Sequence, residues 1–352
     1  MRALTVQPGR SDSLAVTEVP DPVPGGEELL VQGLVLGVCG TDKEIVRGEY
    51  GWAPHGRDRL VLGHESLGQV LEAPEGSDFS AGDLVVGVVR RPDPEPCGAC
   101  AHDEWDMCRN GRYTERGIKE LDGYGSQRWT VPAKFAVGVD SQLGHAGVLL
   151  EPTSVVAKAW EQVERVGARA WFEPQRVLIT GAGPIGLLAA MIGVQRGLEV
   201  HVVDLVTDGP KPRLIADLGA TYHHGSIDDI AREARPDVVI EATGVGRLAF
   251  DAISQTGPYG IVCLTGVSQS GRKLSIDAGG LNREVVLEND AVVGSVNANL
   301  RHYRTAAQAL AAADLDWLQR LITRRVPLDR AAEAFEASGD DVKVVITLDA
   351  DT

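Results

Sequence analysis

The sequence predicts an α/β protein in two domains, a β-rich one at the amino end and a doubly wound parallel-sheet one after it. Three observations carry this prediction. The chain has 352 residues, more than one ordinary hydrophobic core encloses, and 43% of them are hydrophobic. Short apolar runs broken by glycine and proline fill residues 1 to about 90. From residue 151 on, apolar runs alternate with helical patterns.

The amino-terminal segment is predicted to form strands because its apolar residues come in short runs rich in β-branched side chains. Examples are "LLVQGLVLGV", "LGQVLEA" and "GDLVVGVVRR", and no helical period is sustained among them. Residues 91–128 are rich in proline, glycine, charge and cysteine, which predicts mostly irregular structure.

In the second half of the chain, strand-like apolar runs alternate with segments of helical period. "EPTSVVAKAWEQVERV" places Val155, Val156, Ala159 and Val163 on one face of a helix. The strands "RVLITG", "EVHVVD", "DVVIEATG", "GIVCLTG" and "AVVGSVN" then alternate with the helices "PIGLLAAMIGVQRG", "KPRLIADLG" and "GRLAFDAISQ". This order implies a parallel sheet covered on both faces. Two helical stretches and a last strand, "KVVITL", follow residue 300.

Charge and cysteine content limit the function classes. The net charge of −16 argues against nucleic acid or an anionic membrane as a partner. Five cysteines in so long a chain do not make a disulfide scaffold. The start "MRALTVQPGR" has no apolar signal region, and no apolar run approaches the roughly 20 residues of a membrane helix. We therefore expect a soluble, cytoplasmic protein.

A glycine-rich turn marks a dinucleotide site. Gly181, Gly183 and Gly186 have G-x-G-x-x-G spacing after an apolar strand, and Pro184 and Ile185 open the helix that follows. The first glycine permits the tight turn, the second admits a pyrophosphate, and the third packs helix on strand. The helix N-terminus would hold the diphosphate, as in the Rossmann fold.

An acidic residue ends the next strand. Asp204 lies 21 residues after Gly183, since 204 − 183 = 21, where a carboxylate binds both hydroxyls of the adenosine ribose. Such a carboxylate would repel a 2′-phosphate, so NAD is predicted over NADP. Lys211 and Arg213 follow closely and would soften that preference.

Three cysteines gather in the irregular segment. Cys97, Cys100 and Cys108 have C-x2-C-x7-C spacing in "CGACAHDEWDMC", and a C-x2-C pair turns two sulfurs toward one ion. A closed structural zinc site needs a fourth ligand, for which the candidates are Asp93, Glu95, His102 and Asp103. A loop of reduced thiols without metal stays an alternative. A redox C-x-x-C is disfavoured because this pair is not at a strand-helix junction.

A second ligand set comes from the β-rich segment. Cys39 follows an apolar run in "LGVCGTDKE", and His64 and Glu65 stand together in "LVLGHESLG". Glu151 lies where the two domains join. Each residue alone is most often a core or loop residue. Together with a dinucleotide motif, a thiolate, an imidazole and a carboxylate predict a catalytic zinc with one open position, which stabilises charge on an alcohol oxygen.

These motifs resemble those of a known superfamily over nearly the whole chain. "GVCGTD", "GHESLG", the cysteine loop, "EP" and "GAGPIG" are similar to the zinc-dependent medium-chain dehydrogenases. "DMCRNGRYTERGIKELDGYGSQRW", "EPTSVVAKAW" and "VVGSVNAN" resemble its glucose (aldose) 1-dehydrogenase branch, which oxidises aldoses at C1 to the lactone. The resemblance implies a GroES-like catalytic domain (1–154 and 300–352), a Rossmann cofactor domain (155–299) and a homodimer or homotetramer.

The resemblance also implies roles for particular residues. Cys39, His64 and Glu151 would contact the catalytic zinc, with Glu65 as an alternating or outer ligand. Thr41, two residues after Cys39, would hydrogen-bond the reacting hydroxyl or its water, and Glu151 would also contact the substrate. Sugar hydroxyls would bind Glu115 and Asn297. The remaining cofactor contacts would come from Thr243, Gly244, Thr265, Gly266, Val267, Ser295 and Asn297.

Two departures from the family pattern matter. The family's loop usually carries four cysteines, and its first position falls at Pro94 here, which leaves Asp93 or Glu95 to complete a site. Aldose dehydrogenases of this branch often use NADP, but "DLVTDG" follows the second strand here, so NAD stays the prediction. Cys263 is predicted to be a core thiol.

Other functions stay open at this stage. A zinc enzyme acting on a polyol such as sorbitol, or on threonine, would differ only in the lining of its pocket. A zinc-free reductase of the same fold would lack the Cys39 and His64 set. A non-catalytic NAD-binding protein would not need a metal set at all.

Overall fold

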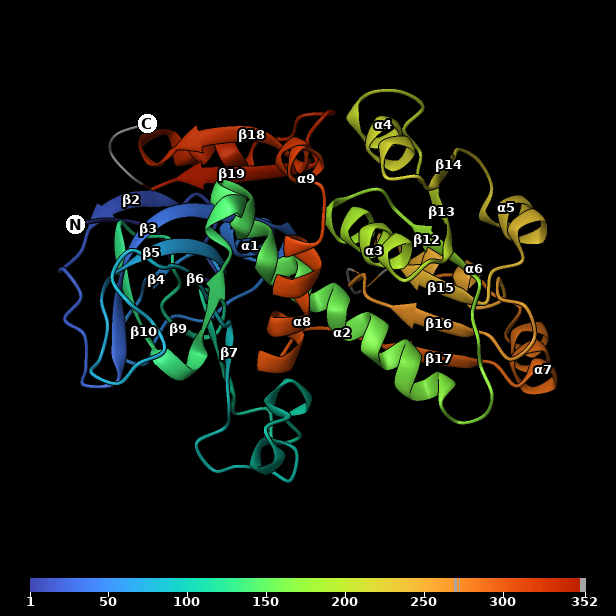
Figure 1. The fold of residues 1–352 in the computed structure, drawn as a ribbon, viewed down its shortest axis with the longest axis horizontal. Coiled ribbons are helices and arrows are strands. Elements are labelled where there is room, and N and C mark those ends of the chain that lie inside the picture. The colour runs from blue at the N-terminus through green and yellow to red at the C-terminus, as the bar shows by residue number, and fades with distance from the viewer. Residues whose placement is uncertain (269–270, 272, 349–352) are drawn as a thin grey trace. The chain divides into compact units, whose positions relative to one another are not determined.

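The computed structural model describes residues 1–268, 271 and 273–348. The chain forms two compact units, the first from Met1–Ser154 with Asn297–Thr352 and the second from Val155–Val296. Figure 1 shows the carboxy-terminal strand β19 beside β3 of the amino-terminal part, with which it pairs. The first unit is thus assembled from both ends of the chain.

The first unit is built around a seven-stranded sheet of order β11-β6-β5-β3-β19-β18, with β10 also paired to β3. Its strands are β3 (Glu28–Val38), β5 (Glu65–Glu72), β6 (Leu84–Gly87), β10 (Arg128–Pro132), β11 (Ala136–Val139), β18 (Ile322–Pro327) and β19 (Lys343–Thr347). In the antiparallel pair β3 and β5, Gly37 lies opposite Glu65. β19 enters the sheet between β3 and β18, so its side chains reach the interior.

Two small sheets complete the strands of the first unit, in the orders β2-β1-β4 and β7-β8-β9. They comprise β1 (Arg2–Val6), β2 (Ala15–Glu18), β4 (Leu60–Val61), β7 (Arg90–Arg91), β8 (Thr114–Arg116) and β9 (Glu120–Leu121). The segment predicted as irregular otherwise holds two single-turn 3₁₀ helices, η1 (Cys100–His102) and η2 (Trp105–Met107).

The helices of the first unit are short. They are α1 (Gly40–Val46), α8 (Leu300–Ala311), α9 (Leu315–Leu321) and the 3₁₀ segments η3 (Ala133–Phe135), η4 (Ser141–Leu149) and η5 (Leu328–Phe335). The sequence did not predict α1, because seven residues are too few to sustain a helical period. This helix begins directly after Cys39, which places the start of α1 at the first ligand set.

The second unit contains a six-stranded, all-parallel sheet of order β14-β13-β12-β15-β16-β17. Its strands are β12 (Arg176–Thr180), β13 (Glu199–Val203), β14 (Thr221–His223), β15 (Val238–Glu241), β16 (Ile261–Leu264) and β17 (Ala291–Gly294). The chain order reverses between β12 and β15, the place where open α/β sheets bind ligands at the carboxyl ends of their strands.

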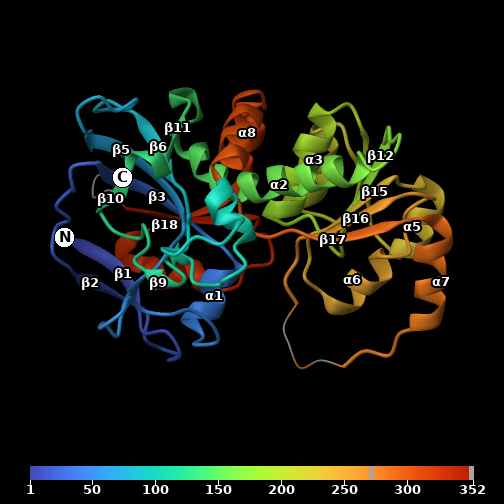
Figure 2. The ribbon, with the colours of Figure 1, turned by 90° about the horizontal axis from the view of Figure 1, so that it is seen from below.

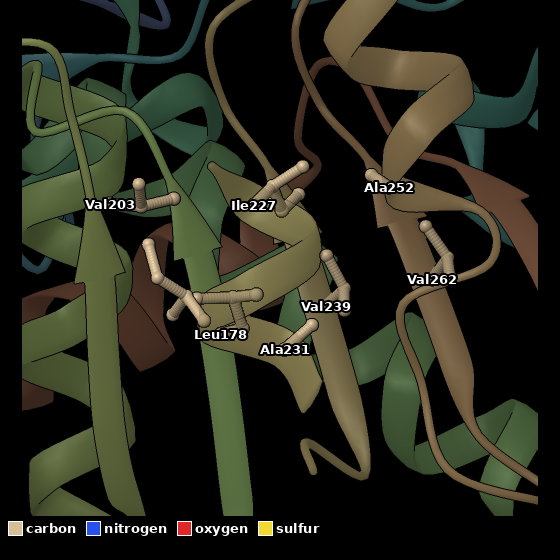
Figure 3. Packing of buried hydrophobic residues seen from close by; sticks show 8 residues of the cluster. Leu178, Val203, Ile227, Ala231, Val239, Ala252 and Val262 are labelled. Carbon is tan, nitrogen blue, oxygen red and sulfur yellow. The ribbon is translucent and has the colours of Figure 1, made fainter. Parts of the chain in front are cut away.

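Helices cover both faces of this sheet. They are α2 (Leu150–Gly167), α3 (Pro184–Gln195), α4 (Pro210–Asp217), α5 (Ile227–Ala234), α6 (Gly246–Ala252) and α7 (Ala278–Glu288). Figure 2 shows α3 and α6 on opposite faces. On the α5 and α6 face, Ile227, Ala231 and Ala252 pack against Leu178 and Val239 of the strands (Figure 3). This doubly wound arrangement is the one that the alternating pattern predicts.

The helices are not membrane spans. In the described part of the chain, none combines the length and the apolar character that crossing a bilayer requires. The longest, α2, has 18 residues and carries Lys158, Glu161, Glu164 and Arg165 along its length.

Candidate active site

Cys39, His64 and Glu65 come together in the first unit. Cys39 lies between β3 and α1, His64 immediately precedes β5, and Glu65 is the first residue of β5. Because β3 and β5 pair with Gly37 opposite Glu65, the end of one strand meets the start of the other. The three ligand atoms lie within 4.8 Å of one another, with Cys39 Sγ 3.1 Å from His64 Nε2.

Asp42 orients two of these ligands. Its Oδ1 lies 3.3 Å from His64 Nδ1, and its Oδ2 accepts a hydrogen bond of 3.0 Å from the backbone N–H of Cys39. A carboxylate on the far nitrogen of a histidine fixes the ring so that the other nitrogen faces a metal. An acid three residues after Cys39 in "CGTD" was the sequence signal for Asp42, but the motif alone did not assign its role.

Lys343 is a second residue that the sequence analysis missed. It is the first residue of β19 and is 1% exposed. Its ammonium contacts the Glu65 carboxylate and donates a 3.2 Å hydrogen bond to the carbonyl of Val38. A lysine at the head of the apolar run "KVVITL" was the signal, because buried lysines need an anionic partner.

The electrostatics of this cluster suit a cation. Burial raises the pKa of the Cys39 thiol. Burial lowers the pKa of His64, but the charges of Cys39 and Asp42 outweigh it and raise that pKa well above its usual value. Burial, reinforced by the Glu65 charge, raises the pKa of Glu151 to about 7. A largely buried set of a thiol, an imidazole and carboxylates fits a divalent ion, which binds their deprotonated forms.

The other residues predicted for this centre lie close by in the chain or in the fold. Thr41 is in the first turn of α1 and is partly buried. Glu151 is 8% exposed near the start of α2, and it is not among the three donors that lie within 4.8 Å. The charges of His64, Glu65 and Lys343 nevertheless affect the pKa of its carboxyl group.

Glu115 and Asn297, the predicted sugar-binding pair, contact each other. Asn297 Nδ2 donates a 2.9 Å hydrogen bond to Glu115 Oε1. That oxygen also accepts a 3.0 Å hydrogen bond from Nε of Arg90, and Glu115 is buried. Asn297 has a φ of 62°, the left-handed region that asparagine tolerates. Arg90 was missed because its role depends on the pairing of β7 with β8.

The three cysteines of the loop form a second cluster. The sulfurs of Cys97, Cys100 and Cys108 lie within 4.8 Å of one another. Cys97 Sγ accepts the backbone N–H of Arg109 at 3.3 Å. That hydrogen bond and one from the backbone of Cys100 lower the pKa of Cys97 to about 6, whereas burial raises the pKa of Cys100 to about 11.

Asp93, the predicted fourth ligand, lies outside the group of sulfurs. Its Oδ1 accepts the backbone N–H of Glu95 at 2.8 Å, and its Oδ2 lies 3.4 Å from Arg112 Nε. Glu95 is itself paired to Arg112 at 2.9 Å. His102 Nδ1 lies 2.7 Å from the carbonyl of Gly98. Among the residues that the structure describes, the donors that gather at this loop are the three thiols.

The glycine turn of the second unit has the predicted geometry. β12 ends at Thr180, and Gly181 has a φ of 92°, which only glycine adopts readily. Gly183 is the N-cap of α3, and Pro184 is its first residue. A Cβ on Gly186 would collide with the carbonyl oxygen of Gly181. The turn therefore has the geometry with which helix N-termini bind anionic groups.

The remaining residues predicted to bind a cofactor lie at the same edge of the sheet. Parallel strands end at a common edge, and each of these residues directly follows a strand or lies in the loop after it. They are Asp204 after β13, Thr243 and Gly244 after β15, Thr265, Gly266 and Val267 after β16, and Ser295 after β17. Cys263 is within β16 and fully buried in the core.

Asp204 is held by the turn itself. Its Oδ2 accepts the backbone N–H of Ala182 at 2.6 Å, and Lys211 Nζ lies 3.5 Å away. Burial raises the pKa of Asp204, but the Ala182 N–H and Lys211 outweigh it, so the pKa lies below its usual value. The carboxylate is therefore ionised at neutral pH. Arg213 is exposed on α4.

Two protein families match this chain. The family described as the glucose dehydrogenase C-terminus matches residues 144–348, and the alcohol dehydrogenase GroES-like domain matches residues 25–141. The chain belongs to the glucose dehydrogenase family. The predicted membership of the zinc-dependent medium-chain dehydrogenases, in their glucose dehydrogenase branch, is thereby confirmed.

Individual members of the glucose dehydrogenase family match over the full chain. The glucose 1-dehydrogenase of Methanocella arvoryzae is 41% identical over 99% of this chain and 100% of the relative. That of Thermoproteus tenax is 43% identical over 98% of this chain and 99% of the relative. The glucose dehydrogenase of Haloferax mediterranei, solved in complex with NADP, Zn and gluconolactone, has a TM-score of 0.91 at 33% identity, covering 99% and 100% of the chains. The predicted α/β fold class is confirmed.

Proposed function

We propose that this protein is a zinc-dependent dehydrogenase that oxidises the C1 hydroxyl of an aldose, with glucose as the preferred substrate, and passes the hydride to NAD(P). The observation that carries the proposal is the gathering of Cys39, His64 and Glu65 within 4.8 Å in a chain of the glucose dehydrogenase family. The product is the sugar lactone, which balances the loss of a hydride and a proton.

The donor set fits zinc in a catalytic role. Cys39 and His64 would hold the ion together with a carboxylate, either Glu151 or Glu65, and one position would stay open. When bound, zinc stabilises the negative charge that develops on the alcohol oxygen. Lys343 competes for Glu65, which favours Glu151 as the more available carboxylate.

The side chains around the metal would carry out the proton transfer. Thr41 would hydrogen-bond the reacting hydroxyl, and the proton would leave through Thr41 and water to whichever of Glu65 and Glu151 does not hold the ion. Asn297 binds sugar hydroxyls together with Glu115, which Arg90 holds in place. A sugar that lacks the hydroxyl bound by the buried Glu115 would lose that hydrogen bond, at a cost of about 1–3 kcal/mol.

We propose NAD as the preferred dinucleotide. The ionised Asp204 would accept hydrogen bonds from the ribose hydroxyls and repel a 2′-phosphate. Lys211 neutralises part of that charge, so the preference is moderate. Replacement of Asp204 by Asn should therefore raise the kcat/KM for NADP relative to NAD by about tenfold, measured as initial rates with both cofactors. An unchanged ratio would remove Asp204 from the selectivity.

A second zinc is proposed on Cys97, Cys100 and Cys108. Their thiolates supply three bonds, and Asp93 stays the proposed fourth ligand, for which zinc would compete with Arg112 and the backbone N–H of Glu95. We further propose that the two compact units act as catalytic domain and cofactor domain, and that the protein is a cytoplasmic homodimer or homotetramer without nucleic-acid or membrane partners.

One experiment tests the central proposal. Initial rates of NAD and NADP reduction are measured with glucose, galactose, xylose, sorbitol and threonine, before and after treatment with a zinc chelator. The proposal expects aldose-dependent rates that the chelator abolishes and that added zinc restores. Activity only with sorbitol or threonine would be compatible with the zinc site but would contradict an aldose as the substrate. Activity that resists the chelator would contradict the proposed catalytic role of zinc.

A further inference from the structure

Glu241 is a buried carboxylate at the cofactor edge that the proposed function does not use. It is the last residue of β15, where the strand order reverses toward β12, and it is 0% exposed. Its Oε1 accepts hydrogen bonds from the hydroxyl of Thr180 (3.4 Å), the backbone N–H of Thr243 (2.7 Å) and that of Gly244 (3.2 Å). The side chain therefore ties the end of β12 to the loop after β15.

The main chain of Glu241 binds the next loop. Its carbonyl oxygen accepts the N–H (2.8 Å) and the hydroxyl (2.7 Å) of Thr265 and the N–H of Gly266 (3.1 Å). A Cβ on Gly266 would lie 2.7 Å from Glu241 Oε2 and would collide with the backbone of Gly244. The carboxylate is thus enclosed between the two loops predicted to line the cofactor.

The charge of this carboxylate has no counter-charge in the described residues. Its Oε2 has no hydrogen-bond partner there, and no described lysine, arginine or histidine is ion-paired with Glu241. Burying an ionised group is costly unless charges or hydrogen bonds compensate it. The three donors named above and the hydroxyl of Thr243 all lie on Oε1, so negative potential is left on the side of Oε2.

We propose that Glu241 is a positioning residue whose negative charge favours the oxidised nicotinamide over the reduced one. The inference rests on the proposed dinucleotide site. The oxidised ring carries one positive charge, and gaining a hydride, which is two electrons and one proton, makes it neutral. A fixed negative charge on the cofactor edge therefore stabilises one redox form selectively, which is the condition for shifting an equilibrium. It also spaces the loops that receive the ring.

The isosteric variant Glu241→Gln tests this on the full-length protein. The dissociation constants of NAD⁺, NADH and ADP-ribose are measured for variant and wild type. We expect the ratio Kd(NADH)/Kd(NAD⁺) to fall by about tenfold, as expected for a charge at a separation of order 10 Å in an effective dielectric of about 20. ADP-ribose lacks the nicotinamide, so its affinity should change by less than about twofold.

Two outcomes would overturn the inference. An unchanged Kd ratio with intact binding would show that the charge of Glu241 does not act on the nicotinamide. An equal loss of affinity for all three ligands would show that Glu241 has a purely structural role. Wild-type protein that bound none of the three would overturn the proposed cofactor site itself, and this inference with it.

Asp237, the residue just before the same strand, offers a matched control. It precedes β15 at the opposite end, and its Oδ2 accepts the backbone N–H groups of Gln175 (2.7 Å) and Arg176 (2.9 Å). Asp237→Asn removes a similar carboxylate far along the strand from the cofactor edge. It should lower the thermal midpoint and leave the Kd ratio unchanged.

Thr180→Val keeps the inference testable if the Gln variant fails to fold. It removes a hydroxyl whose positive end points at Glu241 Oε1 and leaves the carboxylate in place. The negative potential that Glu241 creates at the nicotinamide ring should then become stronger, and the ratio Kd(NADH)/Kd(NAD⁺) should rise above the wild-type value. An unchanged or lower ratio would contradict the proposed role.

Discussion

Two clusters in the first unit each bring three metal-type donors within 4.8 Å, but their surroundings differ. In the first, an imidazole and a carboxylate are buried beside a partly buried thiol, Asp42 contacts the histidine, and Lys343 contacts the glutamate. In the second, the donors are sulfur alone, and backbone N–H groups support them in a short loop. Mixed donors with side-chain partners suit ligand exchange during a reaction, whereas a thiolate set suits a tightly held structural ion.

The largest effect that this comparison predicts is at Cys39. Cys39→Ala removes a donor from the mixed cluster, so we expect kcat/KM for glucose to fall by about a thousandfold or more. Zinc content, measured by atomic emission, should fall by one ion per chain. Cys263→Ala is the matched control, because this thiol is buried in β16 of the second unit, belongs to neither cluster and should leave rate and zinc content intact. Full zinc content in the Cys39 variant would contradict the assignment.

A smaller effect is expected at the residue behind the histidine. Asp42→Asn keeps the shape of the side chain but weakens the hold on His64, and losing such a partner costs about 10–100-fold in metal affinity or activity. Competition with a chromophoric chelator measures the affinity. Asp83→Asn, at an exposed turn, changes a carboxylate that accepts only the N–H of Ser80 and should have no effect. Equal behaviour of the two variants would refute the orienting role.

The sulfur cluster should respond in stability rather than in rate. Cys97→Ser and Cys108→Ser are expected to lower the thermal midpoint by about 5 °C while kcat changes less than about twofold. Differential scanning calorimetry with and without chelator measures this. A chelator that does not move the midpoint of the wild type would mean that the three thiols hold no metal.

The smallest effect distinguishes the sulfurs from one another. In chelator-treated protein, Cys97 should be alkylated faster than Cys100, because their pKa values are about 6 and about 11. A lowered pKa means that the thiolate persists down to lower pH. The alkylation rate of Cys97 should therefore rise through pH 6 and level off near pH 7. Mass spectrometry of the iodoacetamide adducts measures this rate. A midpoint near pH 9 would contradict the backbone stabilisation.

The local motifs were predictable from sequence, but their partners were not. The glycine turn and the Cys39 and His64 segments depend on a few consecutive residues, so spacing and residue type sufficed. Asp42, Lys343 and Glu241 act through contacts set by helix start, sheet order and register. Lys343 lies 278 residues after Glu65, since 343 − 65 = 278, and only the insertion of β19 beside β3 joins them.

The same insertion has a consequence for biosynthesis. The second unit is one continuous segment, Val155–Val296, so it can fold as soon as it leaves the ribosome. The sheet of the first unit must wait for β19, because its place between β3 and β18 is filled by residues 343–347. The nascent chain thus carries Cys39 and His64 for most of translation without the lysine that neutralises Glu65. Metal capture by an unfinished chain would precede completion of the centre.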